Sequence, residues 1–142
     1  MNPRRAISLI AVFVFVSVLS ATAQQKQVKK TAAPQTSAAS GKEMFNEYCG
    51  SCHGIDGTGK GPAAASLKVQ PTDLTQLAKN NGGKFPTAHV HELMNGRAST
   101  AAHGSADMPV WGPVFLRVSH SHESEVQLRI NNLTEHIQSL QK

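Results

Sequence analysis

The sequence is organised around residues 49–53, which read Cys49-Gly50-Ser51-Cys52-His53. Two cysteines separated by two residues, with a histidine directly after the second, form the attachment signature of a covalent haem. Because Cys49, Cys52 and His53 lie within about one helical turn, their side chains can face the same porphyrin. Each thiol then forms a thioether with a haem vinyl group, and His53 supplies an axial ligand to the iron. The motif uses both cysteines of the chain and therefore predicts one haem c, joined through Cys49 and Cys52.

Two other readings of this pentapeptide have less support in the surrounding sequence. A redox-active Cys-x-x-Cys dithiol of the thioredoxin type follows a strand within a βαβ pattern, and no such pattern surrounds residues 49–53. A structural zinc site requires four ligands, and the chain has no second cysteine pair.

Residues 1–23 have the pattern of a secretory signal peptide. Arg4 and Arg5 provide the charged start, an apolar run covers 6–19, and Ala21-Thr22-Ala23 fits a cleavage site of small residues. The apolar run is shorter than the roughly 20 residues that a membrane-spanning helix needs. We therefore expect cleavage before Gln24 and export of the protein; an uncleaved segment would tether it to the membrane.

Residues 24–39 read as a flexible basic linker, because they contain a single valine and no other large apolar residue. Lys26, Lys29 and Lys30 give this stretch a charge of +3. Five of the 14 Lys and Arg residues precede residue 40, whereas all nine Asp and Glu residues follow it, so 40–142 is neutral. The net charge of +5 is thus no sign of nucleic-acid binding. The linker is a solvated spacer, or a tail that makes weak contacts with lipid headgroups or an acidic partner.

Residues 40–142 are predicted to form one all-α domain. One Trp, one Tyr and three of the five Phe residues would make a thin core, to which a buried haem adds apolar bulk. A capping box formed by Ser40 and Glu43 predicts a helix over 41–50. Further helices are expected over about 73–79, capped by Thr72, and from Thr87 to Gly96.

The last helix has the clearest periodicity and is expected over 124–141. Its apolar residues recur at spacings of four and three, and Ser121 is its expected N-cap; the stripe comprises Val126, Ile130, Leu133, Ile137 and Leu140. No alternating strand pattern is present, and 54–62 and 99–112 read as loops.

The second axial ligand of the iron has several candidates. Met108 precedes Pro109, which favours an extended backbone at Met108 and helps the loop to present its side chain rigidly. Met44 and Met94 lie on apolar helical faces, where a methionine usually serves packing. We therefore predict Met108 as the ligand. A bis-histidine centre remains the alternative, and its candidates are His89, His91, His103, His120, His122 and His136.

Residues 40–142 resemble class I c-type cytochromes, small monohaem electron carriers exported from bacteria. Gly41 and Phe45 match the family positions at which the first and last helices cross. Met108-Pro109 matches the distal methionine loop, and Trp111 looks like a common extension of it. Pro62 matches the proline whose carbonyl accepts a hydrogen bond from the proximal imidazole. His136 departs from the family, which usually has an aromatic residue there.

This resemblance implies a cytochrome c-like fold wrapped around the haem and a monomeric periplasmic electron carrier, not an enzyme. Its partners would be redox proteins that donate and accept the electron. Two alternatives stay open. The chain can be a haem subunit of a larger dehydrogenase or oxidase, or a ligand-binding sensor or peroxidase-like protein whose iron releases Met108.

Overall fold

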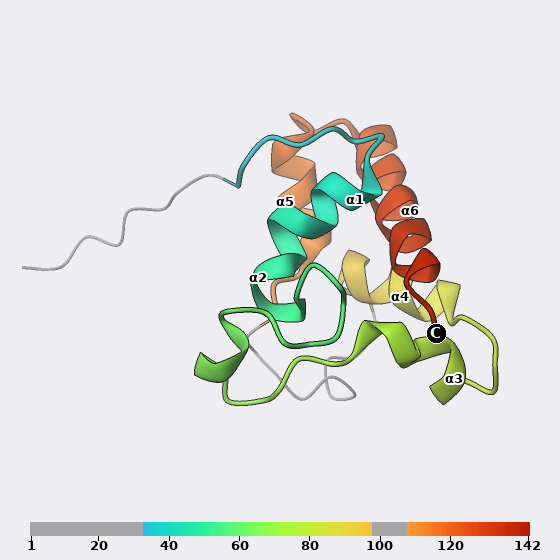
Figure 1. Cartoon of the computed structure of the whole chain (residues 1–142). Coiled ribbons are helices and arrows are strands. Elements are labelled where there is room, and N and C mark those ends of the chain that lie inside the picture. The colour runs from blue at the N-terminus through green and yellow to red at the C-terminus, as the bar shows by residue number, and fades with distance from the viewer. Residues whose placement is uncertain (1–32, 98–107) are drawn as a thin grey trace, which may run out of the picture. The chain divides into compact units, whose positions relative to one another are not determined.

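The computed structural model describes residues 33–97 and 108–142, and these residues are helical without any strand, as predicted. The elements are α1 (Gly41–Met44), η2 (Phe45–Cys49), α2 (Gly50–His53), η3 (Ala64–Ser66), η4 (Leu74–Gln76), α3 (Leu77–Asn80), α4 (Thr87–Asn95), α5 (Trp111–Val118) and α6 (Glu123–Ser139). Helix α6 contacts α1, α4 and α5 (Figure 1). The expected signal peptide, residues 24–32 of the expected linker and His103 lie outside the described residues. Within the described residues, no helix has both the length and the apolarity that crossing a membrane requires.

The first helical run is longer than predicted and changes its winding midway. Ser40 caps it as expected, because its hydroxyl accepts a hydrogen bond from the Glu43 amide at 3.1 Å. The run then continues through one π-helical turn, η2, and ends at His53 instead of residue 50. Single π turns inside helices are frequent at functional sites, and this one leads directly into the cysteine pair.

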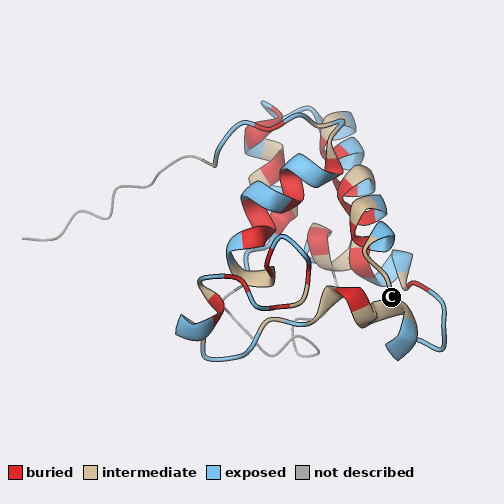
Figure 2. Ribbon diagram, in the orientation of Figure 1, coloured by how far each residue is buried: buried red, intermediate tan, exposed pale blue. Residues whose placement is uncertain are grey.

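Helices α1 and α6 pack closely, as predicted. A Cβ atom on Gly41 would overlap the backbone carbonyl of Asn132, so only glycine permits this approach. Phe45 is fully buried at the contact, and its ring lies 5.2 Å from that of His136. Figure 2 shows the buried residues gathered on the faces that α1 and α6 turn toward the interior of the domain.

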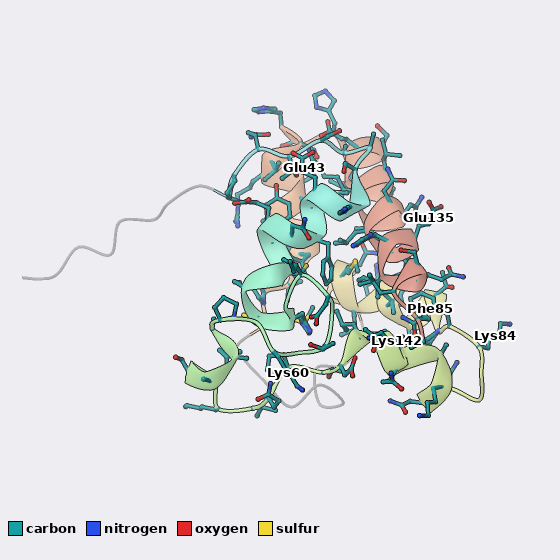
Figure 3. All side chains as sticks on the ribbon, in the orientation of Figure 1. Glu43, Lys60, Lys84, Phe85, Glu135 and Lys142 are labelled. Carbon is teal, nitrogen blue, oxygen red and sulfur yellow. The ribbon has the colours of Figure 1, made fainter. Side chains whose placement is uncertain are left out.

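The apolar stripe of α6 is confirmed, whereas the predicted helix ends are wrong. Its residues 126, 130, 133 and 137 are buried, and Leu140 is half-buried. The N-cap is His122 instead of Ser121. Ser121 has a φ of 67°, in the left-handed region, because it belongs to the tight turn between α5 and α6. Glu135 on α6 and Lys84 before α4 project away from the interior (Figure 3).

The two helical segments in the middle of the chain follow the prediction with one correction. Helix α4 ends at Gly96, which adopts a φ of 74° and forms a left-handed C-cap. The segment expected over 73–79 consists of η4 and α3, and its cap is Asp73 instead of Thr72. The Asp73 carboxylate accepts a hydrogen bond from the Thr75 amide at 2.9 Å.

Helix α5 was not predicted, because 99–112 was read as a loop and the residues after it were left unassigned. Trp111, Phe115 and Val118 are buried and follow one another at spacings of four and three. Pro113 hid this pattern, although a proline in the first helical turn breaks no internal hydrogen bond.

Residues 33–39 also differ from the prediction, because they lie against the domain instead of continuing a flexible linker. Thr36 is 9% exposed, and the Asn132 side chain donates a hydrogen bond to the Ala38 carbonyl at 2.8 Å. Polar side chains of the domain hold this segment, together with the packing of Ala33 against the core. Composition alone therefore gave no sign of its order.

His136 lies at the contact between α1 and α6, where its imidazole lowers the stability of the fold. Its Nε2 atom is buried and has no hydrogen-bond partner among the described residues. Burial lowers the pKa of His136, and the charge of Lys42 lowers it further. The unfolded chain therefore takes up a proton near pH 6.5 before the folded chain does, so this group's contribution to stability falls as the pH drops.

We expect His136→Phe to raise the free energy of unfolding by about 1 kcal/mol, since an unpaired buried polar atom is removed. Denaturant titrations at pH 7 and pH 5 measure this gain. The variant should also lose less stability than the wild type between the two pH values. An equal loss in both proteins would contradict this account of His136.

Candidate haem site

The motif side chains lie at one cavity of about 500 Å³. Cys49 is buried at the end of η2, Cys52 and His53 follow in α2, and all three line the same wall. The other walls come from the segment 67–77, from α4, from α6 and from residues 108–111. The structure thus brings together Cys49, Cys52, His53, Met108 and Trp111, which the sequence predicted as site residues.

The cavity suits a large apolar cofactor. Its lining is mostly aliphatic and aromatic, and its volume lies within the roughly 300–1,000 Å³ typical of ligand sites. Leu133 and Ile137, the inner residues of the α6 stripe, form part of the wall. A haem therefore fits the residues present, with thiols and an imidazole available on one side.

The imidazole of His53 is oriented by a backbone carbonyl. Its Nδ1 atom lies 3.1 Å from the carbonyl oxygen of Thr72, and in the tautomer with a proton on Nδ1 this atom donates the hydrogen bond. The other ring nitrogen is then the one that can bind a metal. Burial lowers the pKa of His53, and the Thr72 bond offsets part of this effect, so the neutral ring that a metal requires is favoured.

Pro62, predicted to accept this hydrogen bond, does not do so in the structure. It is exposed and does not line the cavity. The paths of two loops explain why Thr72, and not Pro62, lies beside the His53 ring. The loop before Pro62 is bonded back to α2, with the Gly61 amide donating to the Cys52 carbonyl at 3.0 Å. The segment that contains Thr72 lies beside the imidazole instead, since the Leu74 amide donates to the Gly57 carbonyl at 2.8 Å.

The Cys49 thiol lacks the lowered pKa of a redox-active cysteine. Burial, with a smaller contribution from Cys52, raises the pKa of the Cys49 thiol to about 12. Reactive cysteines have lowered pKa values, because the thiolate is the nucleophile. In the described part of the chain, no three His, Cys, Asp or Glu side chains cluster closely enough to hold a metal ion, so the zinc reading gains no support either.

The three methionine candidates occupy different environments. Met108 lines the cavity and is 41% exposed at its rim. Met94 is 4% exposed within the wall, and its sulfur lies 4.0 Å from the Thr134 hydroxyl. Met44 does not line the cavity, and its sulfur lies 3.8 Å from a guanidinium nitrogen of Arg129. Met44 and Met94 are thus buried among packed side chains, whereas Met108 is partly exposed.

Among the described histidines other than His53, only His89 lines the cavity. His136 is part of the helix contact, and His122 bonds the Ser119 carbonyl through Nδ1 at 2.9 Å.

Two contributors to the site were not predicted as site residues. Thr72 acts through its carbonyl, and a backbone atom leaves no signal in residue type. Tyr48, predicted only as part of an apolar helix face, lines the cavity and packs against Trp111 with ring centroids 5.5 Å apart. Tyr48 directly precedes the first cysteine of the Cys-x-x-Cys-His motif. This proximity is the sequence signal that could have pointed to it.

Comparison with protein families agrees with this geometry. The family model described as Cytochrome c matches residues 38–141, which include the whole cavity lining. The chain belongs to the cytochrome c family. Membership implies a covalent haem c and haem-based electron transfer, and it confirms the all-α fold expected from the sequence. No curated protein and no solved structure matches this cytochrome.

Proposed function

We propose that this cytochrome is an exported, monomeric one-electron carrier whose iron is held by His53 and Met108. The observation that carries the proposal is the placement of both residues at one cavity together with Cys49 and Cys52. A haem bound there supplies reversible one-electron chemistry at its iron. With His53 and Met108 holding the iron, the thioether sulfur would raise the reduction potential relative to ligation by two histidines.

The residues of the cavity have separate tasks in this proposal. The two cysteines fix the cofactor covalently, and the Thr72 carbonyl holds the plane of the His53 ring. Trp111, Leu133 and Ile137 exclude water from the interior of the cavity. If His53 and Met108 both held the iron, no position would remain for dioxygen or peroxide, so substrate chemistry would be disfavoured.

The sequence supports the proposal of export and of redox partners. The signal-like segment 1–23 supports secretion to the periplasm. Members of the cytochrome c family are typically extracytoplasmic, which agrees with this location. We propose that redox proteins donate and accept the electron, and that the lysines of residues 24–39 contribute at most weak contacts with a membrane surface or an acidic partner.

Spectroelectrochemical titration of the haem-loaded protein tests this function. We expect a single, fully reversible one-electron transition, because the chain has one attachment motif. The reduced protein should bind carbon monoxide only slowly, since Met108 must leave first. Rapid binding of carbon monoxide, or turnover of hydrogen peroxide, would overturn the carrier and favour the sensor or peroxidase-like alternative.

A further inference from the structure

Residues 33–39, here called the strap, are joined to the domain through Thr36. This threonine is 9% exposed, although the strap is otherwise largely exposed or half-buried. Its hydroxyl lies 3.1 Å from Nη1 of Arg129 and 2.9 Å from the hydroxyl of Tyr48.

These contacts form a chain of hydrogen bonds in which each group donates to the next, from Arg129 to the strap. Arg129 can only donate, so the Thr36 oxygen accepts from it. The Tyr48 hydroxyl donates to the Pro34 carbonyl, and its oxygen therefore accepts from Thr36. Chains in which each group both accepts and donates strengthen one another in a buried setting.

Arg129 is a fixed starting point for this chain. It is 3% exposed, and the Glu125 carboxylate lies 2.7 Å from its Nη2 atom. Its Nε atom also donates to the Ser119 hydroxyl at 3.1 Å. A buried guanidinium held by Glu125 and Ser119 fixes the place of its Nη1 atom. That atom donates to Thr36 and also lies 3.8 Å from the Met44 sulfur, so the position of the Thr36 hydroxyl is determined by α6.

Tyr48 connects the strap to the cavity, because it bonds Thr36 and also lines the cavity wall. Its ring lines the cavity and packs against Trp111 and Phe115, with centroids 5.5 and 5.7 Å away. Aromatic pairs at such separations favour specific mutual orientations. Trp111 starts α5 and lies three residues after Met108, so the wall that Tyr48 supports also fixes one end of the Met108 segment.

We propose that Thr36 is a positioning residue for the iron site: through Tyr48 and Trp111 it holds the Met108 segment against the cavity. The strap is then part of the electron-transfer domain and not of the linker. This inference rests on the proposed function, because it takes Met108 as the axial ligand.

Displacement of Met108 by added imidazole tests the inference in the oxidised, haem-loaded, full-length mature protein. Thr36→Val keeps the shape of the side chain and removes both hydrogen bonds of its hydroxyl. We expect imidazole to bind the variant about fivefold more tightly, the factor that corresponds to about 1 kcal/mol less stabilisation of the Met108 segment. The haem methyl proton resonances should shift with it.

Three further variants separate positioning from general stability. Thr36→Ser retains the hydroxyl and should restore the wild-type affinity for imidazole. Gln35→Ala, at an exposed neighbour within the strap, should leave the affinity unchanged. Tyr48→Phe keeps the ring but breaks the chain from its other end, and it should reproduce the effect of Thr36→Val.

The outcomes distinguish this inference from the function on which it rests. Wild-type imidazole affinity and haem resonances in both Thr36→Val and Tyr48→Phe would overturn the role of the strap and leave the carrier intact. A wild-type protein without thioether ligation would overturn both the Met108 assignment and the role of Thr36.

Discussion

Replacing Cys49 and Cys52 together with alanine is expected to abolish covalent haem attachment and, with it, the folded domain. The cavity of about 500 Å³ would lose its covalently held occupant. At about 24 cal/mol per Å³, an uncollapsed void of this size costs about 12 kcal/mol, which is as large as the entire stability of a typical domain. The remaining core is thin and cannot offset this cost, so unfolding is the expected response.

Two measurements check this prediction after coexpression with a haem-attachment system. Mass spectrometry of the denatured protein should find one haem on the wild type and none on the double variant. Far-UV circular dichroism should show a helical wild type and a mostly unfolded variant. Ser51→Ala, at the exposed residue between the cysteines, is the matched control and should retain both haem and helix. A wild type with the mass of the polypeptide alone would refute covalent attachment.

The sequence predicted those parts of the fold that depend on residue type at regular spacing. The α6 stripe, the close approach at Gly41 and the helix stop at Gly96 are visible as periodicity or as single glycines, and the structure confirms them. Helix α5 was missed, since Pro113 near its start suggested a loop. The strap was missed because it is ordered by hydrogen bonds with residues far away in the sequence, such as Arg129.

The site residues also fall into those that the sequence predicted and those that only the structure shows. Cys49, Cys52 and His53 follow from a local motif, and the structure places them together at the cavity. The partner of the His53 ring does not follow from any motif, because it is a carbonyl supplied by whichever loop packs beside the ring. The structure gives that position to Thr72, whereas the resemblance implied Pro62.

Met108→Ala is expected to change the iron site more than any other single substitution outside the attachment motif. The oxidised wild type should show the weak long-wavelength absorption band of iron bound to thioether sulfur, and the variant should lose it. The reduction potential should fall by on the order of 0.1–0.2 V, a fraction of the roughly 0.8 V that axial ligands can span. Carbon monoxide should bind the reduced variant rapidly, because one axial position is open.

The matched controls are the other two described methionines of the domain. Met94→Leu and Met44→Leu conserve volume in the cavity wall and in the core, so both variants should keep the band and the potential. The bis-histidine alternative predicts the reverse pattern: no band in the wild type and little response to Met108→Ala. In that case His89→Ala and His103→Ala identify the ligand, since His89 lines the cavity and His103 lies in the segment before Met108. Electron transfer would survive such a result, whereas the assignment of Met108 and the positioning role of Thr36 would not.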